Sequence, residues 1–236
     1  GCLEDDLVRR DFTINAMALV LGDGGSVPEL LDLHGGQRDL AARQLNFLHA
    51  RSVKDDPTRV VRAARYAARL DFSLALEALE QVRCTLEGWP WRWHQGDCLD
   101  SVPPALSTRL RMELELLFER EPWRIAVVRL QEWGAMPLLD RQLQLDGQLI
   151  RRLHWAERLN VPLLCALAAA SATPQCLARR LQLPLQQQRR IDQWIAMRCW
   201  MSEHVLPHPW QSWSAARWSS CLEAQAWGAD VVALAV

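Results

Sequence analysis

The stretch KDDPTRVVRAARYAARL, at positions 54–70, decides the fold of this chain. At 3.6 residues per turn, a helix over these positions places Arg62, Arg65 and Arg69 on one face. Small apolar residues fall on the opposite face: Val60, Ala64 and Ala67. The spacing therefore predicts an amphipathic helix with a stripe of arginines and a thin apolar seam.

Two further residues, Asp56 and Arg59, lie one turn apart at the edge of the stripe. In the simpler interpretation, Asp56 before Pro57 is an N-cap and complements the helix dipole. That interpretation does not explain why the arginines have no acidic residues at i+4. Because one guanidinium group can make bidentate contacts to phosphate oxygens, the stripe favours binding of a triphosphate or an RNA backbone. Asp56 and Arg59 together present an acceptor and a donor to a base edge, worth roughly 1–3 kcal/mol of discrimination.

The first residues form a second motif, LEDDLVRRDFTINAMA at positions 3–18, which predicts a charged helix through Met17. Arg10 follows Asp6 at i,i+4 spacing, which is typical of a surface helix with weak ion pairs. Asp11 and Asn15 have the same spacing, and both have side chains that can hydrogen-bond ribose hydroxyls. Taken alone, the motif favours the surface helix.

A third motif, DLHGGQRDL at positions 32–40, predicts a glycine-containing turn capped by Asp39 before a short helix. Between the second and third motifs, two extended apolar runs flank the glycine-rich turn at 22–25, so we expect a β-hairpin there. From Pro57 onward the periodicity is helical. Prolines stand where helices are expected to start, at positions 122, 162, 174 and 184.

Composition narrows the class of protein. Half of the 236 residues are hydrophobic, enough for a buried core, and the formal net charge of −1 gives no global basic field. No apolar run approaches the roughly 20 residues of a membrane span. The seven cysteines include no Cys-x-x-Cys pair, which predicts a reduced, cytoplasmic protein without structural zinc.

Taken in order, the three motifs resemble those of the class II CCA-adding tRNA nucleotidyltransferases and bacterial poly(A) polymerases. That family carries Leu-Glu-Asp-Asp-Leu-x-Arg-Arg-Asp-Phe-Thr-Ile-Asn-Ala, then Asp-Pro-x-x-Gly-x-x-Asp-Leu, then Glu-Asp-Pro-x-Arg-x-x-Arg-x-x-Arg-Phe-x-Ala-Arg-Leu. The match covers about the first third of the chain. Asp55 stands where the family has glutamate, Tyr66 where it has phenylalanine, and Leu33 and His34 where it has proline and an aromatic residue.

The resemblance implies a mainly α fold, with a remnant of a polymerase-β-like nucleotidyltransferase head followed by a helical neck, body and tail. We expect the head remnant at 1–48, the neck with the nucleotide-reading helix at 49–120, and an RNA-binding body and tail at 121–236. By motif, Asp56 and Arg59 would read the base edge. The other residues implied to bind the nucleotide are Arg62 and Arg65 at its phosphates, and Arg10, Asp11 and Asn15 at sugar and phosphate.

The resemblance also implies ATP, CTP and the 3′ end of tRNA or another RNA as partners, with Mg²⁺ as cofactor. The family's Gly-Gly-x-x-Arg-Asp loop and Asp-x-Asp metal ligands are not among these 236 residues. Two-metal phosphoryl transfer needs such carboxylates to hold the metal. We therefore expect no catalytic residue and no metal ligand in this chain, and no catalysis by the chain alone.

Three interpretations of the function remain open. The favoured one is a segment of an enzyme that adds CCA, or C or A alone, to tRNA. The second is a segment of a poly(A) polymerase. The third is a non-catalytic module that binds nucleotide or RNA. The predicted hairpin would expose an unpaired sheet edge in a stand-alone protein, which favours a segment of a larger enzyme.

Overall fold

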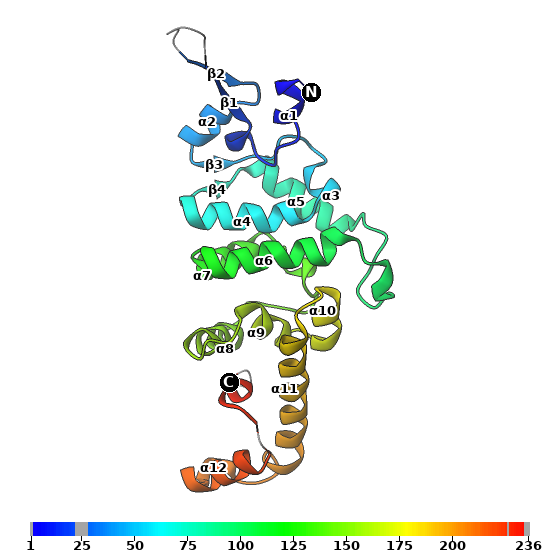
Figure 1. The fold of residues 1–236 in the computed structure, drawn as a ribbon, viewed down its shortest axis with the longest axis vertical. Coiled ribbons are helices and arrows are strands. Elements are labelled where there is room, and N and C mark those ends of the chain that lie inside the picture. The colour runs from blue at the N-terminus through cyan, green and yellow to red at the C-terminus, as the bar shows by residue number, and fades with distance from the viewer. Residues whose placement is uncertain (1, 22–27, 226, 234–236) are drawn as a thin grey trace. The chain divides into compact units, whose positions relative to one another are not determined.

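The computed structural model describes residues 2–21, 28–225 and 227–233. The chain divides into two compact units, Gly1–Leu138 and Leu139–Val236, and both are built mainly from helices (Figure 1). A mainly α fold with a short β-hairpin near the start of the chain is therefore confirmed. The predicted domain boundaries, at 48/49 and 120/121, both fall inside the first unit, and the three-part division stays a prediction.

The chain opens with short elements rather than one long helix. These are α1 (Leu3–Leu7), a 3₁₀ turn η1 (Thr13–Asn15), and the antiparallel strands β1 (Met17–Val20) and β2 (Glu29–Asp32). The predicted helix through Met17 is wrong because Phe12 is fully buried and stacks on Phe47, which takes the chain out of the helical path. The predicted hairpin is confirmed, with Met17 opposite Asp32; the turn predicted at 22–25 lies outside the described residues.

The third motif forms α2 (Gly36–Ala41), which begins earlier than predicted. Asp32, and not Asp39, caps it: the Asp32 carboxylate accepts hydrogen bonds from the backbone N–H groups of Gly36 and Gln37, at 2.7 and 2.9 Å. The hydrogen bond from the Gln37 N–H lowers the pKa of Asp32. Asp39 is instead buried, and it accepts hydrogen bonds from Thr13 and Asn46 that tie α2 to η1 and the following segment.

The stretch at 54–70 forms α4 (Thr58–Leu70) at the centre of the first unit (Figure 1). On one side, α4 contacts its neighbours in the sequence, α3 and β4. On the other side, α6 and α7 pack against it. The remaining elements of this unit are β3 (Gln44–Leu45), α3 (Ser52–Asp55), β4 (Ser73–Leu74), α5 (Leu76–Gly88), η3 (Leu99–Ser101), η4 (Pro104–Leu106), α6 (Thr108–Arg120), α7 (Trp123–Glu132) and η5 (Met136–Leu138). Because α4 is covered from both sides, its seam of Val60, Ala64 and Ala67 is buried, and so is Arg65.

The second unit consists of helices joined by short loops. They are α8 (Gly147–Arg158), α9 (Leu163–Ala169), α10 (Pro174–Arg180), α11 (Leu185–His204), η6 (Trp210–Ser212), α12 (Ala215–Ala224) and α13 (Ala229–Ala233). Prolines 122, 162, 174 and 184 stand at or directly before helix starts, as predicted. In the described part of the chain, no helix has the length and apolar character needed to cross a bilayer.

Candidate functional site

The arginine face of α4 meets acidic side chains from distant parts of the sequence. Asp11 comes from the segment between α1 and η1, Glu113 from the middle of α6, and Glu121 from the residue that ends α6. No acidic residue stands at i+4 along α4, but these three carboxylates form ion pairs with its arginines. The arginines that lack acidic residues at i+4 are therefore paired through tertiary contacts.

At the first turn of α4, Asp11 holds two arginines. Its Oδ1 lies 3.1 Å from Nε of Arg59, and its Oδ2 pairs with Nη1 of Arg62. Arg59 also reaches the backbone carbonyl of Ser52 at 3.5 Å, while its Nη1 lies 3.5 Å from Nε2 of His49. The Arg59 side chain is only 13% exposed. The segment between α1 and η1 is thereby fixed to the start of α4 through the carboxylate of Asp11.

One turn further along, Glu113 is shared between Arg62 and Arg65. Its Oε1 accepts two hydrogen bonds from Arg62, at 3.0 and 2.7 Å, and its Oε2 accepts one from Arg65 at 2.5 Å. Burial lowers the pKa of Arg62, but hydrogen bonds to Glu113 and Asp11 more than offset this and raise it above the ordinary arginine value. Arg62 is therefore a permanent cation held between two carboxylates.

The last turn of α4 is tied to Glu121, whose side chain has no exposed surface. Arg69 donates to it from Nε at 3.0 Å and pairs with it through Nη2, and Nε of Arg65 lies 3.4 Å away. The hydrogen bond to Glu121 raises the pKa of Arg69. This end of the arginine face joins α4 to α6, which makes Arg69 a structural residue.

Asp56 lies two residues before the first residue of α4, and the N-cap position is Pro57, but the Asp56 carboxylate still accepts the N–H of Thr58. Its Oδ1 accepts hydrogen bonds from the N–H of Thr58 at 3.1 Å and from the Thr58 hydroxyl at 2.7 Å, and its Oδ2 pairs with Arg109 of α6. In the described part of the chain, Asp56 is thus joined to Arg109 while Arg59 is joined to Asp11. The structure does not bring the Asp56 and Arg59 side chains together directly.

Two other predicted site residues are engaged locally. Arg10 pairs with the exposed Asp6 at 2.6 Å, one turn back in the chain. The side-chain oxygen of Asn15 accepts the N–H of Phe12 at 3.2 Å and so closes η1. Of the seven predicted residues, the structure gathers Asp11, Arg59, Arg62 and Arg65 into one network. It leaves Arg10, Asn15 and Asp56 at the margin of that network.

The sequence did not predict three residues that pair with the predicted ones. Glu113 and Glu121 belong to the network, and Arg109 pairs with Asp56 at its margin. One signal for Glu113 was present, because it stands in α6 beside the buried leucines 110, 114 and 117. A buried carboxylate among leucines requires a cationic partner. The arginines of α4 were the available partners, although nothing in the local spacing connects the two helices.

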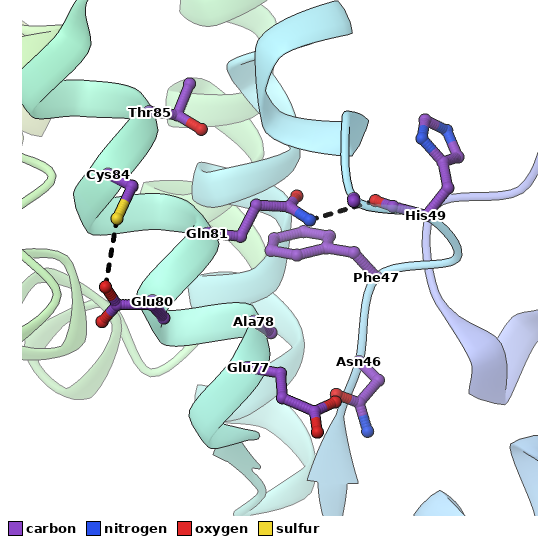
Figure 2. Close-up of a pocket in the computed structure, with 10 residues that line it drawn as sticks. Asn46, Phe47, His49, Glu77, Ala78, Glu80, Gln81, Cys84 and Thr85 are labelled. Carbon is purple, nitrogen blue, oxygen red and sulfur yellow. Dashed lines mark hydrogen bonds between the residues drawn. The ribbon is translucent and has the colours of Figure 1, made fainter.

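A groove of about 440 Å³ lies next to this network, between α5 and the segment that follows β3 (Figure 2). Gln81 of α5 holds that segment: it accepts the N–H of Val53 at 3.1 Å and donates to the carbonyl of His49 at 3.0 Å. The groove is also lined by Glu77 and Glu80. Because these carboxylates repel phosphate, we place no nucleotide in the groove and keep the candidate site at the Asp11, Arg59 and Arg62 cluster.

The acidic side chains that the structure describes do not fit a metal centre. In those ranges, no group of three or more His, Cys, Asp or Glu side chains is arranged to hold a metal ion. The carboxylates nearest the candidate site are paired with arginines. We therefore derive no reaction step through a metal held by these residues.

Comparisons with known proteins agree with the motifs. Residues 2–46 match the model of the poly A polymerase head domain. The chain is 47% identical over 140 residues to the CC-adding tRNA nucleotidyltransferase of Deinococcus radiodurans, covering 59% of this chain and 33% of that protein. It is 52% identical over 146 residues to the multifunctional CCA protein of Cupriavidus pinatubonensis, covering 59% and 32%. The chain thus spans about a third of the length of these curated relatives.

A solved structure shares the fold. The complex of a CCA-adding enzyme with CTP aligns with 98% of this chain and 55% of its own length, with a TM-score of 0.68 and 23% sequence identity. Identity at this level carries the fold alone. The alignment extends over both compact units, although the sequence matches to the two relatives cover only 59% of the chain.

Proposed function

Because the comparisons confirm the resemblance to class II tRNA nucleotidyltransferases and bacterial poly(A) polymerases, we propose that this chain is the nucleotide-reading and RNA-holding part of an enzyme that adds C and A to tRNA 3′ ends. The names of the two relatives support tRNA as the substrate, and the complex with CTP supports a nucleoside triphosphate. The head-domain match is shared with poly(A) polymerases, which makes tailing of other RNA the second candidate.

The observation that carries the proposal is the charge balance on the arginine face. Four arginines of α4 meet three carboxylates, so the network has one more positive than negative charge. Arg59 and Arg62 share the single carboxylate of Asp11, and both keep part of their surface exposed. An incoming triphosphate would supply the missing negative charge, and guanidinium groups suit its oxygens geometrically.

The network also suggests how the residues work. Asp11 and Glu113 orient the guanidinium planes before the nucleotide arrives, which lowers the entropy lost on binding. Arg59 has donor hydrogens left over from its contact with Asp11, and these can face the acceptor atoms of a base. Asp56 can accept from an amino group of C or A if Arg109 is displaced from its Oδ2 or shares it. Arg109 then competes with the base for Asp56.

Titration of the purified chain with CTP and with ATP, followed by calorimetry, tests this site. We expect Arg59→Gln to weaken binding of both nucleotides about tenfold or more, because a bidentate contact is worth roughly 1–3 kcal/mol. Arg69→Gln is the matched control: it removes an arginine from the same face of α4, at the end bound to Glu121, and should leave the affinity unchanged. Equal loss in both variants would contradict the proposal.

Asp56→Asn tests base reading separately. The amide replaces one acceptor oxygen by a donor, so the preference for CTP and ATP should weaken relative to UTP and GTP. Arg109→Gln removes the competing arginine without changing Asp56, and CTP should bind at least as tightly to that variant as to the original chain. An unchanged nucleotide preference in Asp56→Asn would show that Asp56 only caps α4.

The remaining parts of the proposal concern cofactor, activity and location. We propose that Mg²⁺ serves the reaction of the whole enzyme, and that the 236-residue chain alone does not catalyse it. Magnesium-dependent incorporation of CTP into a tRNA that lacks its CCA end, by the purified chain, would contradict the second statement. A cytoplasmic location is supported by the seven cysteines, all of which are free thiols.

A further inference from the structure

The second unit contains a buried arginine, Arg152 of α8, whose charge is not compensated. Arg152 is 8% exposed, and its Nε has no hydrogen-bond partner among the described residues. Among the described residues, the structure gives its guanidinium neither an ion pair nor a hydrogen bond. The two other buried arginines do have partners: Arg65 pairs with Glu113, and Arg180 donates to the carbonyl of Leu139 at 2.7 Å. Arg152 is therefore the exception among buried arginines in the described ranges.

Aromatic packing holds this guanidinium in place. It lies 5.3 Å from the ring centre of Trp194 in α11, and Arg198 lies 4.9 Å from the ring centre of the same indole. Trp194 is itself buried. Such cation–π contacts contribute modestly and do not neutralise the charge. Two positive charges therefore share one tryptophan.

Arg152 lines a recess of about 200 Å³ at the start of α8. The other polar residues of the recess are three glutamines, Gln142, Gln144 and Gln148, and one carboxylate, Asp146. Asp146 accepts the N–H of Leu149 at 2.7 Å and so caps α8, and it forms no ion pair with Arg152. The amide groups of the glutamines can donate hydrogen bonds to a ligand in the recess.

The electrostatics favour an anion here. Burial lowers the pKa of Arg152, and the neighbouring charge of Arg198 lowers it further, while Asp146 raises it. A largely buried guanidinium without an ion pair is unfavourable, and proteins normally pair such a group. The recess is large enough for a tetrahedral anion, and the guanidinium can present two parallel N–H groups to it.

We propose that the recess beside Arg152 is a binding site for a phosphate group, with the Arg152 guanidinium as its principal ligand and Arg198 as a second positive charge. The phosphate can belong to an RNA backbone or be free in solution. Only the RNA source rests on the proposed function; the site in the second unit stands on the geometry of Arg152, Trp194 and the recess.

Thermal unfolding of the full chain tests the site with inorganic phosphate as the probe, against chloride at equal ionic strength. Phosphate should raise the melting temperature of the original chain by a few degrees, because a ligand of the folded state stabilises it. Arg152→Gln should remove the part of this rise that comes from the recess. Arg151→Gln is the matched control, since it removes the neighbouring exposed arginine of the same helix and should keep the rise.

The melting temperatures of the same variant without phosphate, and of a lysine variant with it, separate a binding residue from a merely structural one. Without phosphate, Arg152→Gln should melt no lower than the original chain, because it removes an uncompensated buried charge. Arg152→Lys keeps the charge but loses the planar pair of donors, so it should keep only part of the phosphate effect. An equal phosphate effect in Arg152→Gln and the original chain would overturn the proposal.

Binding of a tRNA transcript that lacks its CCA end, measured over a range of salt concentrations, identifies the source of the phosphate. If the recess holds an RNA phosphate, Arg152→Gln should reduce the slope of log affinity against log salt by about one. Arg151→Gln should reduce this slope by less. A phosphate effect with an unchanged slope assigns the site to free phosphate. Absence of both effects overturns the site, while CTP titration at α4 reports on the proposed function independently.

Discussion

Arg65 of the first unit and Arg152 of the second are both buried, but different groups surround them. In the first unit, Arg62 and Arg65 of α4 share the carboxylate of Glu113, and the network extends to Asp11 and Glu121. In the second unit, the described residues give Arg152 of α8 no ion pair, and its guanidinium lies over the face of Trp194. Compensation inside the protein fixes a helix in place, whereas an uncompensated charge keeps its capacity to bind an anion.

The difference teaches which arginines hold the fold and which are free to bind a ligand. On α4, Arg69 has the carboxylate of Glu121, whereas Arg59 and Arg62 share the single carboxylate of Asp11. The end of the helix is therefore structural, and its start keeps the capacity to bind a ligand. On α8 the described residues give the Arg152 guanidinium no ion pair, which is the basis of the proposed anion site. Altering the acid or the arginine in either unit tests this distinction directly.

The largest effect is expected from Glu113→Ala. Removing this carboxylate leaves Arg65 buried with only a 3.4 Å contact to Glu121, and it takes two hydrogen bonds from Arg62. Breaking a buried ion pair on one side costs about 3–5 kcal/mol of unfolding free energy. Chemical denaturation monitored by circular dichroism measures the loss.

A control comes from the same helix. Glu119 is an exposed carboxylate of α6, and Glu119→Ala should change the unfolding free energy by less than about 0.5 kcal/mol. A similarly small loss in Glu113→Ala would mean that water reaches Arg65 freely, and the contrast between the two units would disappear.

These pairings explain what the sequence predicted and what it did not. The helix α4, which lies within the stretch at 54–70, and the hairpin follow from local spacing, so both were predicted. Glu113 lies 48 positions from Arg65, and no periodicity links them. The early end of α1 depends on Phe12 packing against Phe47, a tertiary contact that overrides the helical pattern. Charge spacing along one helix cannot show acids that arrive from another.

The same limit applies to Arg152. Helical spacing from Leu149 and Ala156 places Arg152, and not Arg151, on the inner face of α8. Only the position of Trp194, 42 residues away, shows what contacts the Arg152 guanidinium. The candidate site at α4 could be proposed from a motif, whereas the recess at α8 required the packing.

A medium effect of opposite sign is expected from Gln148→Glu. This change places a carboxylate in the recess that Arg152 lines and so imitates the compensation seen on α4. A partly exposed pair of this kind contributes up to about 1 kcal/mol. Stability in phosphate-free buffer should rise, and the stabilisation by phosphate should shrink because the added charge repels the anion.

The new glutamate also lies in the first turn of α8, where an acid is favourable by about 0.3–1 kcal/mol through the helix dipole. A double-mutant cycle with Arg152→Gln separates the two contributions, since the dipole effect persists without the arginine. If the gain is the same with and without Arg152, the recess does not bring the two side chains together, and Arg152 is not open to an anion there.

The smallest effect is expected at the exposed pair of Asp6 and Arg10, which provides the reference for both units. The two side chains are 57% and 52% exposed, and they lie one turn apart at 2.6 Å. Water screens such a pair, so a cycle of Asp6→Asn and Arg10→Gln should give a coupling of about 0.5 kcal/mol or less, falling further in high salt. A coupling near that of Glu113 would mean that burial is not what separates strong from weak pairs here. Because Arg10 is also a proposed nucleotide ligand, CTP binding should respond to Arg10→Gln but not to Asp6→Asn, which separates its binding role from this weak pairing.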